Sequence, residues 1–330
     1  MSRRPIRELL EDESERILIL DGGQGTELER RGIDVNHPIW SSSPFLQPDF
    51  WTETAARSVN LNRQIVESVL CDFANAGADI IATTTFQASF EAVMENSTFK
   101  TEAQYKALLE KIINFTRECI DESKYLAGSI GPWGARTRAE FTGDYGNDPA
   151  SIDYYEYNRP QLECFCSSKE IDLILFETIP NFYELKALLS WDESIISKPF
   201  CISISVHNEG VLRDGTSLRD IASYIKSIPR LNTNFLMLGI NCVNLNGSPR
   251  ILDELHHELP GLPLAVYPNS GEVFDTVGER WLPNANGCIT WDEAVKRYIT
   301  AGARIIGGCC RTTPDDIKQI VDAVRRYSKV

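Results

Sequence analysis

The sequence predicts an α/β protein folded as a single-domain (β/α)8 TIM barrel, with long loops at the C-terminal face of the barrel. Three observations support this: eight short apolar runs, helical patterns between many of them, and a length of 330 residues, 42% of them hydrophobic. Such a barrel typically needs about 250 residues, so we assign residues 1–330 to one domain. A doubly wound open sheet is the second fold that the pattern allows, but no Gly-x-Gly-x-x-Gly fingerprint follows a predicted strand.

The eight predicted strands follow one another along the chain. Several are continuous apolar blocks, such as ILIL, IIAT and LILF, and do not alternate with polar residues. Continuous blocks are typical of strands that are buried on both faces of a parallel sheet. In chain order, the strands are expected at residues 16–20, 79–85, 125–130, 172–177, 200–206, 235–241, 262–267 and 303–307.

Helices are expected between the strands, because apolar residues recur there at helical spacing and capping residues mark the ends. In residues 60–77 the apolar positions fall on one helical face, and Gly77 suits the C-terminal cap. Other helix starts are marked by a capping box at Thr290 and Glu293 and by the cap–proline pairs Ser248-Pro249 and Thr313-Pro314.

The composition argues against several functional classes. The formal net charge is −14, from 47 acidic and 33 basic residues, and such a surface repels nucleic acid and anionic membranes. The chain shows no signal peptide and no stretch near the roughly 18 apolar residues of a membrane helix. Nine cysteines, an odd number found mostly in apolar segments, are typical of reduced thiols. We therefore expect a cytoplasmic protein whose partners are small molecules.

Polar and thiol groups gather where the predicted strands end. In a TIM barrel the chemistry lies at the C-terminal ends of the strands, so these residues are the candidates for a site. The longest insertions, at residues 24–56, 133–158 and 270–289, also follow strand ends and would wall a pocket on that face.

Three cysteines stand out among the strand ends. Cys242 ends the sixth run and the pair Cys309-Cys310 ends the eighth, so all three open on the same rim. Three sulfur ligands suit Zn²⁺ and leave a fourth tetrahedral position open, which is the catalytic pattern. A phosphate-binding turn at Gly307-Gly308 is the alternative for the eighth strand end. The other cysteines are interpreted as small buried hydrophobic residues: Cys71, Cys119, Cys164, Cys166, Cys201 and Cys288.

Taken together and in order, the strand ends resemble those of the homocysteine S-methyltransferases. The resemblance covers nearly the whole chain and is greatest to the fungal branch that uses S-methylmethionine or S-adenosylmethionine. It is carried by the segments Leu18-Ile19-Leu20-Asp21-Gly22-Gly23, Gly128-Ser129-Ile130-Gly131-Pro132, Phe176-Glu177-Thr178-Ile179-Pro180, Gly239-Ile240-Asn241-Cys242, Tyr267-Pro268-Asn269-Ser270-Gly271-Glu272 and Gly307-Gly308-Cys309-Cys310-Arg311-Thr312.

The resemblance implies zinc-dependent transfer of a methyl group from a sulfonium donor to the thiol of L-homocysteine, giving methionine. It places one zinc ion per chain on Cys242, Cys309 and Cys310, with Asn241 beside the metal site. The residues that it implies for homocysteine binding are Asp21, Gly22, Thr83 and Glu177. Two carboxylates suit the substrate ammonium, while a hydroxyl and a backbone N–H suit its carboxylate. The alternative for Asp21 and Glu177 is that each caps a following helix.

Aromatic and polar residues near the rim are expected to border the methyl donor, since an aromatic face attracts a sulfonium cation. They are Trp40, Trp133, Tyr267 and Asn269, and ordinary packing is the alternative for the aromatic ones. Gln87 stands where the betaine-using relatives carry an aromatic residue, which favours a sulfonium donor over betaine. Two other functions stay open from the sequence. One is a zinc-binding barrel without turnover, and the other is a redox protein in which Cys309 and Cys310 form the redox-active thiol pair.

Overall fold

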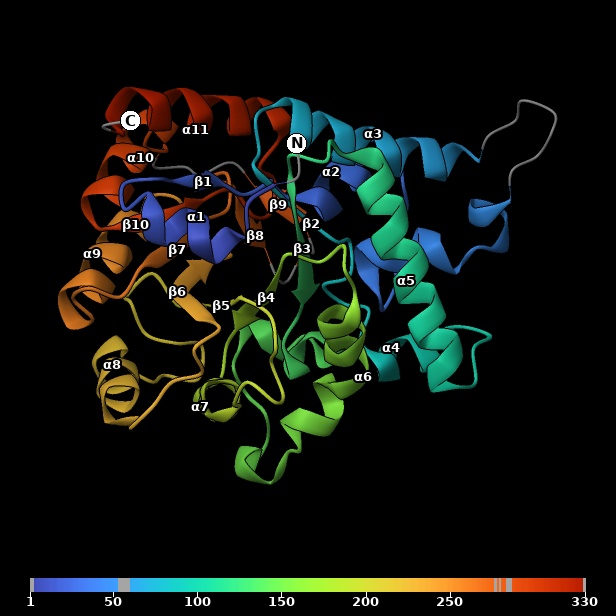
Figure 1. Ribbon diagram of the computed structural model, residues 1–330, viewed down its shortest axis with the longest axis horizontal. Coiled ribbons are helices and arrows are strands. Elements are labelled where there is room, and N and C mark those ends of the chain that lie inside the picture. Colours follow the sequence, from blue (N-terminus) through green and yellow to red (C-terminus); the bar gives the residue numbers. More distant parts are fainter. Residues whose placement is uncertain (1–2, 53–59, 276–277, 279, 283–286, 329–330) are drawn as a thin grey trace.

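The eight predicted strands form a parallel barrel in the computed structural model of the chain, which describes residues 3–52, 60–275, 278, 280–282 and 287–328. The strand order is β1-β10-β7-β6-β5-β4-β3-β2. A parallel bridge from Leu20 to Ile80 joins the two ends, and the Asp21 N–H donates to the Ile80 carbonyl at 3.0 Å. The TIM-barrel prediction is therefore confirmed, and the open-sheet alternative is wrong (Figure 1).

Each barrel strand overlaps a predicted one, and the third and sixth match at both ends. The strands are β1 Leu18–Ile19, β2 Ile80–Ala82, β3 Tyr125–Ile130, β4 Leu173–Ile179, β5 Phe200–Ile204, β6 Phe235–Asn241, β7 Leu264–Tyr267 and β10 Ala303–Ile306. An antiparallel hairpin of β8 Val273–Asp275 and β9 Arg280–Leu282 was not predicted. Its strands have three residues each, too few to give a periodic pattern.

Helices surround the barrel. The α-helices are α1 Ile6–Asp12, α2 Gln24–Arg30, α3 Leu61–Asn75, α4 Phe90–Glu95, α5 Glu102–Cys119, α6 Tyr154–Ser167, α7 Phe182–Ser190, α8 Leu218–Ser227, α9 Ser248–Glu258, α10 Trp291–Thr300 and α11 Pro314–Tyr327. Short 3-10 segments lie in the loops: η1 Trp40–Leu46, η2 Pro48–Trp51, η3 Trp133–Thr137, η4 Ala139–Phe141 and η5 Pro149–Ser151.

The predicted capping signals hold, with one exception. The capping box at Thr290 is present, and Thr313 caps α11. Ser248 was expected to cap α9, but the helix already begins at this residue and Gly247 takes the cap position. The Ser248 hydroxyl instead lies 2.5 Å from the Tyr298 hydroxyl and donates to the Leu245 carbonyl. It therefore makes a tertiary contact in place of the predicted helix cap.

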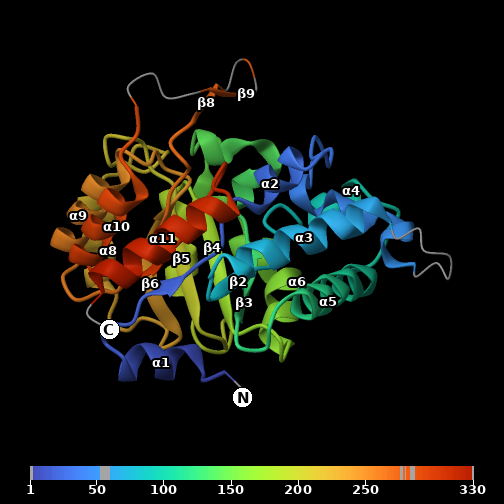
Figure 2. The same ribbon diagram turned by 90° about the horizontal axis from the view of Figure 1, so that it is seen from above.

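The core has two parts, because successive side chains on a strand point to opposite faces. On β1, Ile19 packs outward against the helices while Leu18 faces the barrel interior. Helix α1 covers one end of the barrel and contributes Ile6 to the interior cluster. Figure 2 shows α1 at one end of the barrel and the β8–β9 hairpin at the other. The end that carries the hairpin is the C-terminal end of the strands, where the site residues gather.

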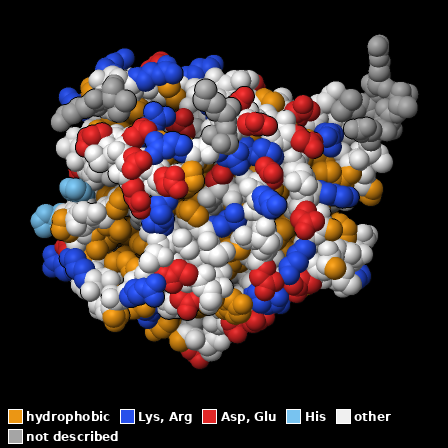
Figure 3. Space-filling model, viewed as in Figure 1, with side chains coloured by type: hydrophobic (Ala, Val, Ile, Leu, Met, Phe, Trp, Pro, Cys, Tyr) orange, Lys and Arg blue, Asp and Glu red, His pale blue; other side chains and the backbone are white. Residues whose placement is uncertain are grey.

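Charged side chains of both signs mix on the outer surface. Figure 3 shows the face that carries α1, with Lys and Arg side chains beside Asp and Glu. On this side Arg3 and Arg117 both contact the carboxylate of Asp172, at 2.7 and 3.3 Å. Among the described residues, no helix is both long and apolar enough to cross a membrane.

Candidate metal and substrate site

The structure brings the three predicted cysteines together. The Sγ atom of Cys242 lies 2.8 Å from that of Cys309 and 3.8 Å from that of Cys310, and the last two are 4.0 Å apart. Cys242 directly follows β6, while Cys309 and Cys310 follow β10, and only β7 separates these strands in the sheet. The cluster could hold a metal ion.

The backbone around the sulfurs is held in a specific conformation by hydrogen bonds and close packing. Cys242 has φ +51°, a left-handed conformation that costs a non-glycine residue on the order of 1 kcal/mol and is concentrated at functional sites. The Cys309 N–H donates to the Pro268 carbonyl at 2.8 Å. A Cβ added to Gly308 would lie 2.1 Å from the Thr312 side chain, so only glycine fits before the cysteine pair.

The Asn241 side chain links the sulfur cluster to strand β4. Its Oδ1 accepts from the Thr178 N–H at 2.8 Å and its Nδ2 donates to the Thr178 hydroxyl at 2.7 Å. The same Nδ2 lies 3.9 Å from the Sγ of Cys309. Asn241 therefore fixes both the end of β6 and one side of the cluster.

As free thiols, these cysteines are poor candidates for ionisation. The hydrogen bond with Cys309 and burial raise the pKa of Cys242 well above its ordinary value. A soft divalent cation reverses this preference, because it binds thiolates and displaces their protons. The close sulfur set therefore suits a metal site better than a set of reactive free thiolates.

Two carboxylates, one buried and one partly buried, lie at strand ends on the mouth of the barrel. Asp21, after β1, is 3% exposed and accepts from the Gln24 side chain at 2.6 Å and from the Ala82 N–H at 3.0 Å. Glu177, in β4, accepts from the Ser129 hydroxyl. Burial raises the pKa of each carboxyl to about 7, and the two repel each other. A cationic ligand would therefore be attracted to this pair and would favour its charged form.

The helix-capping alternative for these two carboxylates is wrong. Helix α2 begins after Gly23, with no side-chain cap from Asp21. Helix α7 is capped by Asn181, whose side chain accepts from the Tyr183 N–H at 2.9 Å. Asp21 instead lies buried at the barrel mouth, and Glu177 lies partly buried there.

Thr83 and Gly22 flank the carboxylates. The Thr83 hydroxyl lies 2.6 Å from that of Thr85 and accepts from the Ser129 N–H at 3.1 Å. A Cβ added to Gly22 would lie 2.5 Å from the Phe73 ring and 2.7 Å from the Thr312 carbonyl. The chain is thus too crowded at Gly22 for any side chain.

The two tryptophans predicted to border the donor lie in the loops after β1 and β3. Trp40 has φ +45°. Its ring packs against Gly25 so closely that a Cβ added to this glycine would lie 2.4 Å from the ring atoms. The Trp133 ring packs against Tyr145 with centroids 4.8 Å apart. Both are partly buried. Their role toward a donor stays a prediction.

Tyr267 ends β7, as predicted, and Asn269 lies two residues beyond it. Tyr267 is 2% exposed and belongs to the barrel-interior cluster, with its hydroxyl beside Glu177. Asn269 donates its N–H to the Val243 carbonyl at 3.0 Å, and its buried Oδ1 has no hydrogen-bond partner among the described residues. That free acceptor leaves Asn269 available to a ligand.

Sequence reasoning missed four residues that the structure places at the site: Gln24, Ser129, Thr178 and Arg213. Gln24 orients Asp21 from three positions further along the chain, a local spacing that could have been noticed. Thr178 reaches Asn241 across 63 positions of sequence, and Ser129 reaches Glu177 across 48. Contacts this distant have no signature in a single sequence.

Comparison with known proteins identifies the family. The family model described as "Homocysteine S-methyltransferase" matches residues 18–324. Homocysteine S-methyltransferase 2 of Saccharomyces cerevisiae is 54% identical over 99% of this chain and 100% of its own length. The chain belongs to the homocysteine S-methyltransferase family.

Further relatives agree with this assignment. Homocysteine S-methyltransferase 1 of the same yeast is 52% identical over 99% of this chain and all of its own. The crystal structure of the metallated form of the homocysteine methyltransferase MmuM from Escherichia coli has a TM-score of 0.74 at 31% identity, covering 96% of this chain and 99% of that one. The predicted family, its fungal branch and the enzyme class are confirmed.

In this methyltransferase-family chain, the cysteines outside the cluster differ in burial. Cys201 is buried in the barrel interior, as a small hydrophobic residue would be. Cys288 was expected to be buried as well, but it is exposed, and its Sγ lies 3.4 Å from the Gly271 carbonyl. The expectation was wrong because Cys288 lies in a loop segment, where no core surrounds it.

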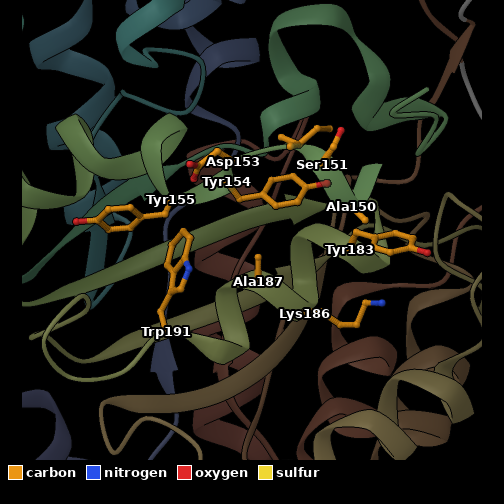
Figure 4. A pocket seen from close by; sticks show the side chains of 10 residues that line it. Ala150, Ser151, Asp153, Tyr154, Tyr155, Tyr183, Lys186, Ala187 and Trp191 are labelled. Carbon is orange, nitrogen blue, oxygen red and sulfur yellow. The ribbon is translucent and has the colours of Figure 1, made fainter. Parts of the chain in front are cut away.

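A surface hollow of about 460 Å³ lies away from the sulfur cluster, on the outer helices (Figure 4). Figure 4 shows Tyr155 and Trp191 toward one end and Tyr183 and Lys186 toward the other. The ammonium of Lys186 lies 3.9 Å from the centre of the Tyr183 ring. Because η5, α6 and α7 form it and the strand ends do not, we do not place the reaction there.

A buried acid holds the loop after β3 in place. Glu184, in α7, is 1% exposed and accepts from the Trp133 N–H at 2.8 Å and from the Tyr145 hydroxyl. Nearby, the Asn181 side chain donates to the Gly143 carbonyl at 3.0 Å. The segment that carries Trp133 is thereby fastened to the start of α7.

We expect Glu184→Gln to remove a pH dependence of stability. Burial raises the pKa of Glu184 from 4.5 to about 7, so the folded protein keeps a proton that the unfolded chain releases. This contribution to stability is complete below pH 4.5 and is lost as the pH rises through about 7. Neutral glutamine cannot ionise. Between about pH 5 and pH 8, the free energy of unfolding of the wild type should therefore fall by about 2 kcal/mol relative to that of the variant.

Denaturant unfolding of both proteins across this pH range measures the difference. Glu184→Ala serves as a comparison, because it leaves the Trp133 N–H and the Tyr145 hydroxyl without their acceptor and should destabilise at every pH. A difference in unfolding free energy between wild type and Glu184→Gln that stays constant with pH would contradict the expectation.

Proposed function

We propose that the chain, acting as a single catalytic domain, transfers a methyl group from S-methylmethionine or S-adenosylmethionine to the thiol of L-homocysteine, giving methionine. We further propose that one zinc ion is held by Cys242, Cys309 and Cys310. The observation that carries the proposal is the convergence of three sulfurs and two carboxylates, Asp21 and Glu177, at the mouth of the barrel. The yeast relatives and the metallated form of the E. coli enzyme support it.

The donor set fits zinc. In a tetrahedral site with Zn–S bonds of about 2.3 Å, the sulfurs lie about 3.8 Å apart. Two of the three sulfur separations, at 3.8 and 4.0 Å, match this value, and the third is shorter at 2.8 Å. When bound, zinc supplies a positive charge that favours the thiolate form of homocysteine near neutral pH.

The chain's own residues would hold the amino-acid end of homocysteine. Asp21 and Glu177 bind its ammonium through charge-assisted hydrogen bonds. The Thr83 hydroxyl and the Gly22 backbone N–H bind its carboxylate. Asn241 keeps the end of β6 in position. Together these contacts direct the substrate sulfur toward the cysteine cluster, which lowers the entropic cost of reaching the donor.

The transfer itself needs no general acid. The lone pair of the homocysteine sulfur forms a bond to the donor methyl carbon, and the electron pair of the breaking C–S bond goes to the donor sulfur. The donor leaves as a neutral thioether, which is methionine when the donor is S-methylmethionine, and the thiol proton passes to solvent. The aromatic faces of Trp40, Trp133 and Tyr267, with the Asn269 oxygen, would favour the sulfonium cation.

The test is methionine formation from homocysteine with each sulfonium donor, with and without a strong zinc chelator. We expect methionine from at least one of the two donors and loss of activity on chelation, because without zinc the acceptor thiol stays mostly protonated at neutral pH. Readdition of zinc should restore the rate. Chelator-resistant turnover would contradict the zinc dependence, and no methionine from either donor would contradict the function.

A further inference from the structure

Arg213 lies at the mouth of the barrel, on a short hairpin that follows β5. Bridges from Val206 to Leu212 and from Val211 to Ser217 define this hairpin. The Nε of Arg213 donates to the Ser205 hydroxyl at 3.1 Å. Cys201 faces the barrel interior, and residues two apart on a strand share a face, so Ser205 continues the interior face past the strand end. The guanidinium therefore lies over the barrel opening.

The hairpin lies beside the strand that leads to the sulfur cluster. It follows β5, which pairs with β6, and Cys242 directly follows β6. The guanidinium of Arg213 projects from this hairpin. Its Nη1 lies 3.2 Å from Nδ1 of His207. Because an arginine can only donate, Nδ1 accepts here and the imidazole proton lies on Nε2. His207 thus holds the guanidinium without neutralising it.

No carboxylate within ion-pair distance balances Arg213 among the residues that the structure describes. Its partners are a hydroxyl and an imidazole, which occupy Nε and Nη1. A guanidinium has five N–H donors, so the Nη2 edge keeps its donors for another group. Other arginines near the rim are matched: Arg311 pairs with Glu272, and Arg136 with Glu91 and Glu95. A half-buried cation held in place with an open donor edge suits an anionic ligand.

We propose that Arg213 binds the α-carboxylate of the sulfonium methyl donor. The inference rests on the proposed function and deepens it, because it names the chemical group by which the donor is recognised. S-methylmethionine and S-adenosylmethionine both carry an α-carboxylate, so the contact serves either one. It selects amino-acid sulfoniums over simple alkyl sulfoniums.

The donor fits this contact better than homocysteine does. Of the homocysteine-binding groups proposed above, Glu177 lies on β4, beside β5, but it is assigned to the ammonium. The homocysteine carboxylate is assigned to Thr83 and Gly22, which follow β2 and β1, and these strands lie three and four places from β5 in the strand order of the barrel. Arg213 projects from a hairpin beyond the end of β5, on the solvent side of the strand ends. A donor that enters over bound homocysteine passes this hairpin.

The experiment pairs a variant with a modified donor. Wild type and Arg213→Gln are assayed with S-methylmethionine and with its amide, in which a neutral carboxamide replaces the carboxylate. For the wild type, we expect the KM of the amide to exceed that of S-methylmethionine by about 10- to 100-fold. In Arg213→Gln the KM of S-methylmethionine should rise by a similar factor, and the two donors should become nearly equal. Arg213→Lys should restore part of the preference.

Three further measurements separate the alternatives. Arg219→Gln changes an exposed arginine of α8 and should behave as wild type. The KM of homocysteine and the bound zinc should be unchanged in Arg213→Gln. The assignment would be overturned if Arg213→Gln kept the wild-type preference for the carboxylate donor. It would also be overturned if the variant bound homocysteine more weakly or lost zinc. A wild type that makes no methionine from any sulfonium donor would instead overturn the proposed function.

Discussion

Cys309→Ser should abolish both metal binding and methyl transfer. Serine replaces a soft sulfur with a hard oxygen in the cluster, where the Sγ of Cys309 lies 2.8 Å from that of Cys242 and 4.0 Å from that of Cys310. With one of three ligands lost, turnover should fall by on the order of 1,000-fold or more. Metal analysis of the purified protein and an assay of methionine formation measure the two effects.

Cys288→Ser is the matched control for this experiment. It makes the same chemical change at an exposed cysteine outside the cluster, so zinc content and turnover should match those of the wild type. Full activity in a zinc-free Cys309→Ser protein would refute the metal role. Loss of metal in both variants would show that the effect of Cys309→Ser is not specific to the cluster.

Asp21→Asn should weaken homocysteine binding strongly while leaving the fold intact. The substitution removes the negative charge that we assign to the substrate ammonium, which should raise the KM of homocysteine by about 100-fold, or about 3 kcal/mol. Burial already raises the pKa of Asp21 to about 7. The stability linked to its bound proton is therefore lost above about pH 7, and a neutral asparagine should be at least as stable there.

Asp79→Asn provides the comparison, since Asp79 precedes β2 at the opposite end of the barrel and accepts from the Ile19 N–H at 2.9 Å. It should alter stability but not the KM of homocysteine. Steady-state kinetics at saturating donor, with thermal unfolding of each variant, measure both quantities. An unchanged KM in Asp21→Asn would remove Asp21 from the proposed substrate site.

The sequence by itself determined the fold class and the order of the eight strands. Continuous apolar blocks predicted eight buried strands, and those at residues 125–130 and 235–241 match the structure at both ends. Since parallel strands of a barrel all end on one rim, this pattern was enough to predict that Cys242 would meet Cys309 and Cys310. Capping at Thr290 and Thr313 was also predictable, because those contacts are local.

Only the tertiary structure decided which side chains orient the site. Asn241 and Thr178, or Ser129 and Glu177, come from different strands, and their pairing depends on the closure and register of the barrel. Ser248 lost its predicted cap role for the same reason, since Tyr298 from another helix reaches its hydroxyl. Arg213 acquires its position from Ser205 and His207 through the turn of a hairpin. Contacts of this kind arise from three-dimensional packing, which local periodicity does not encode.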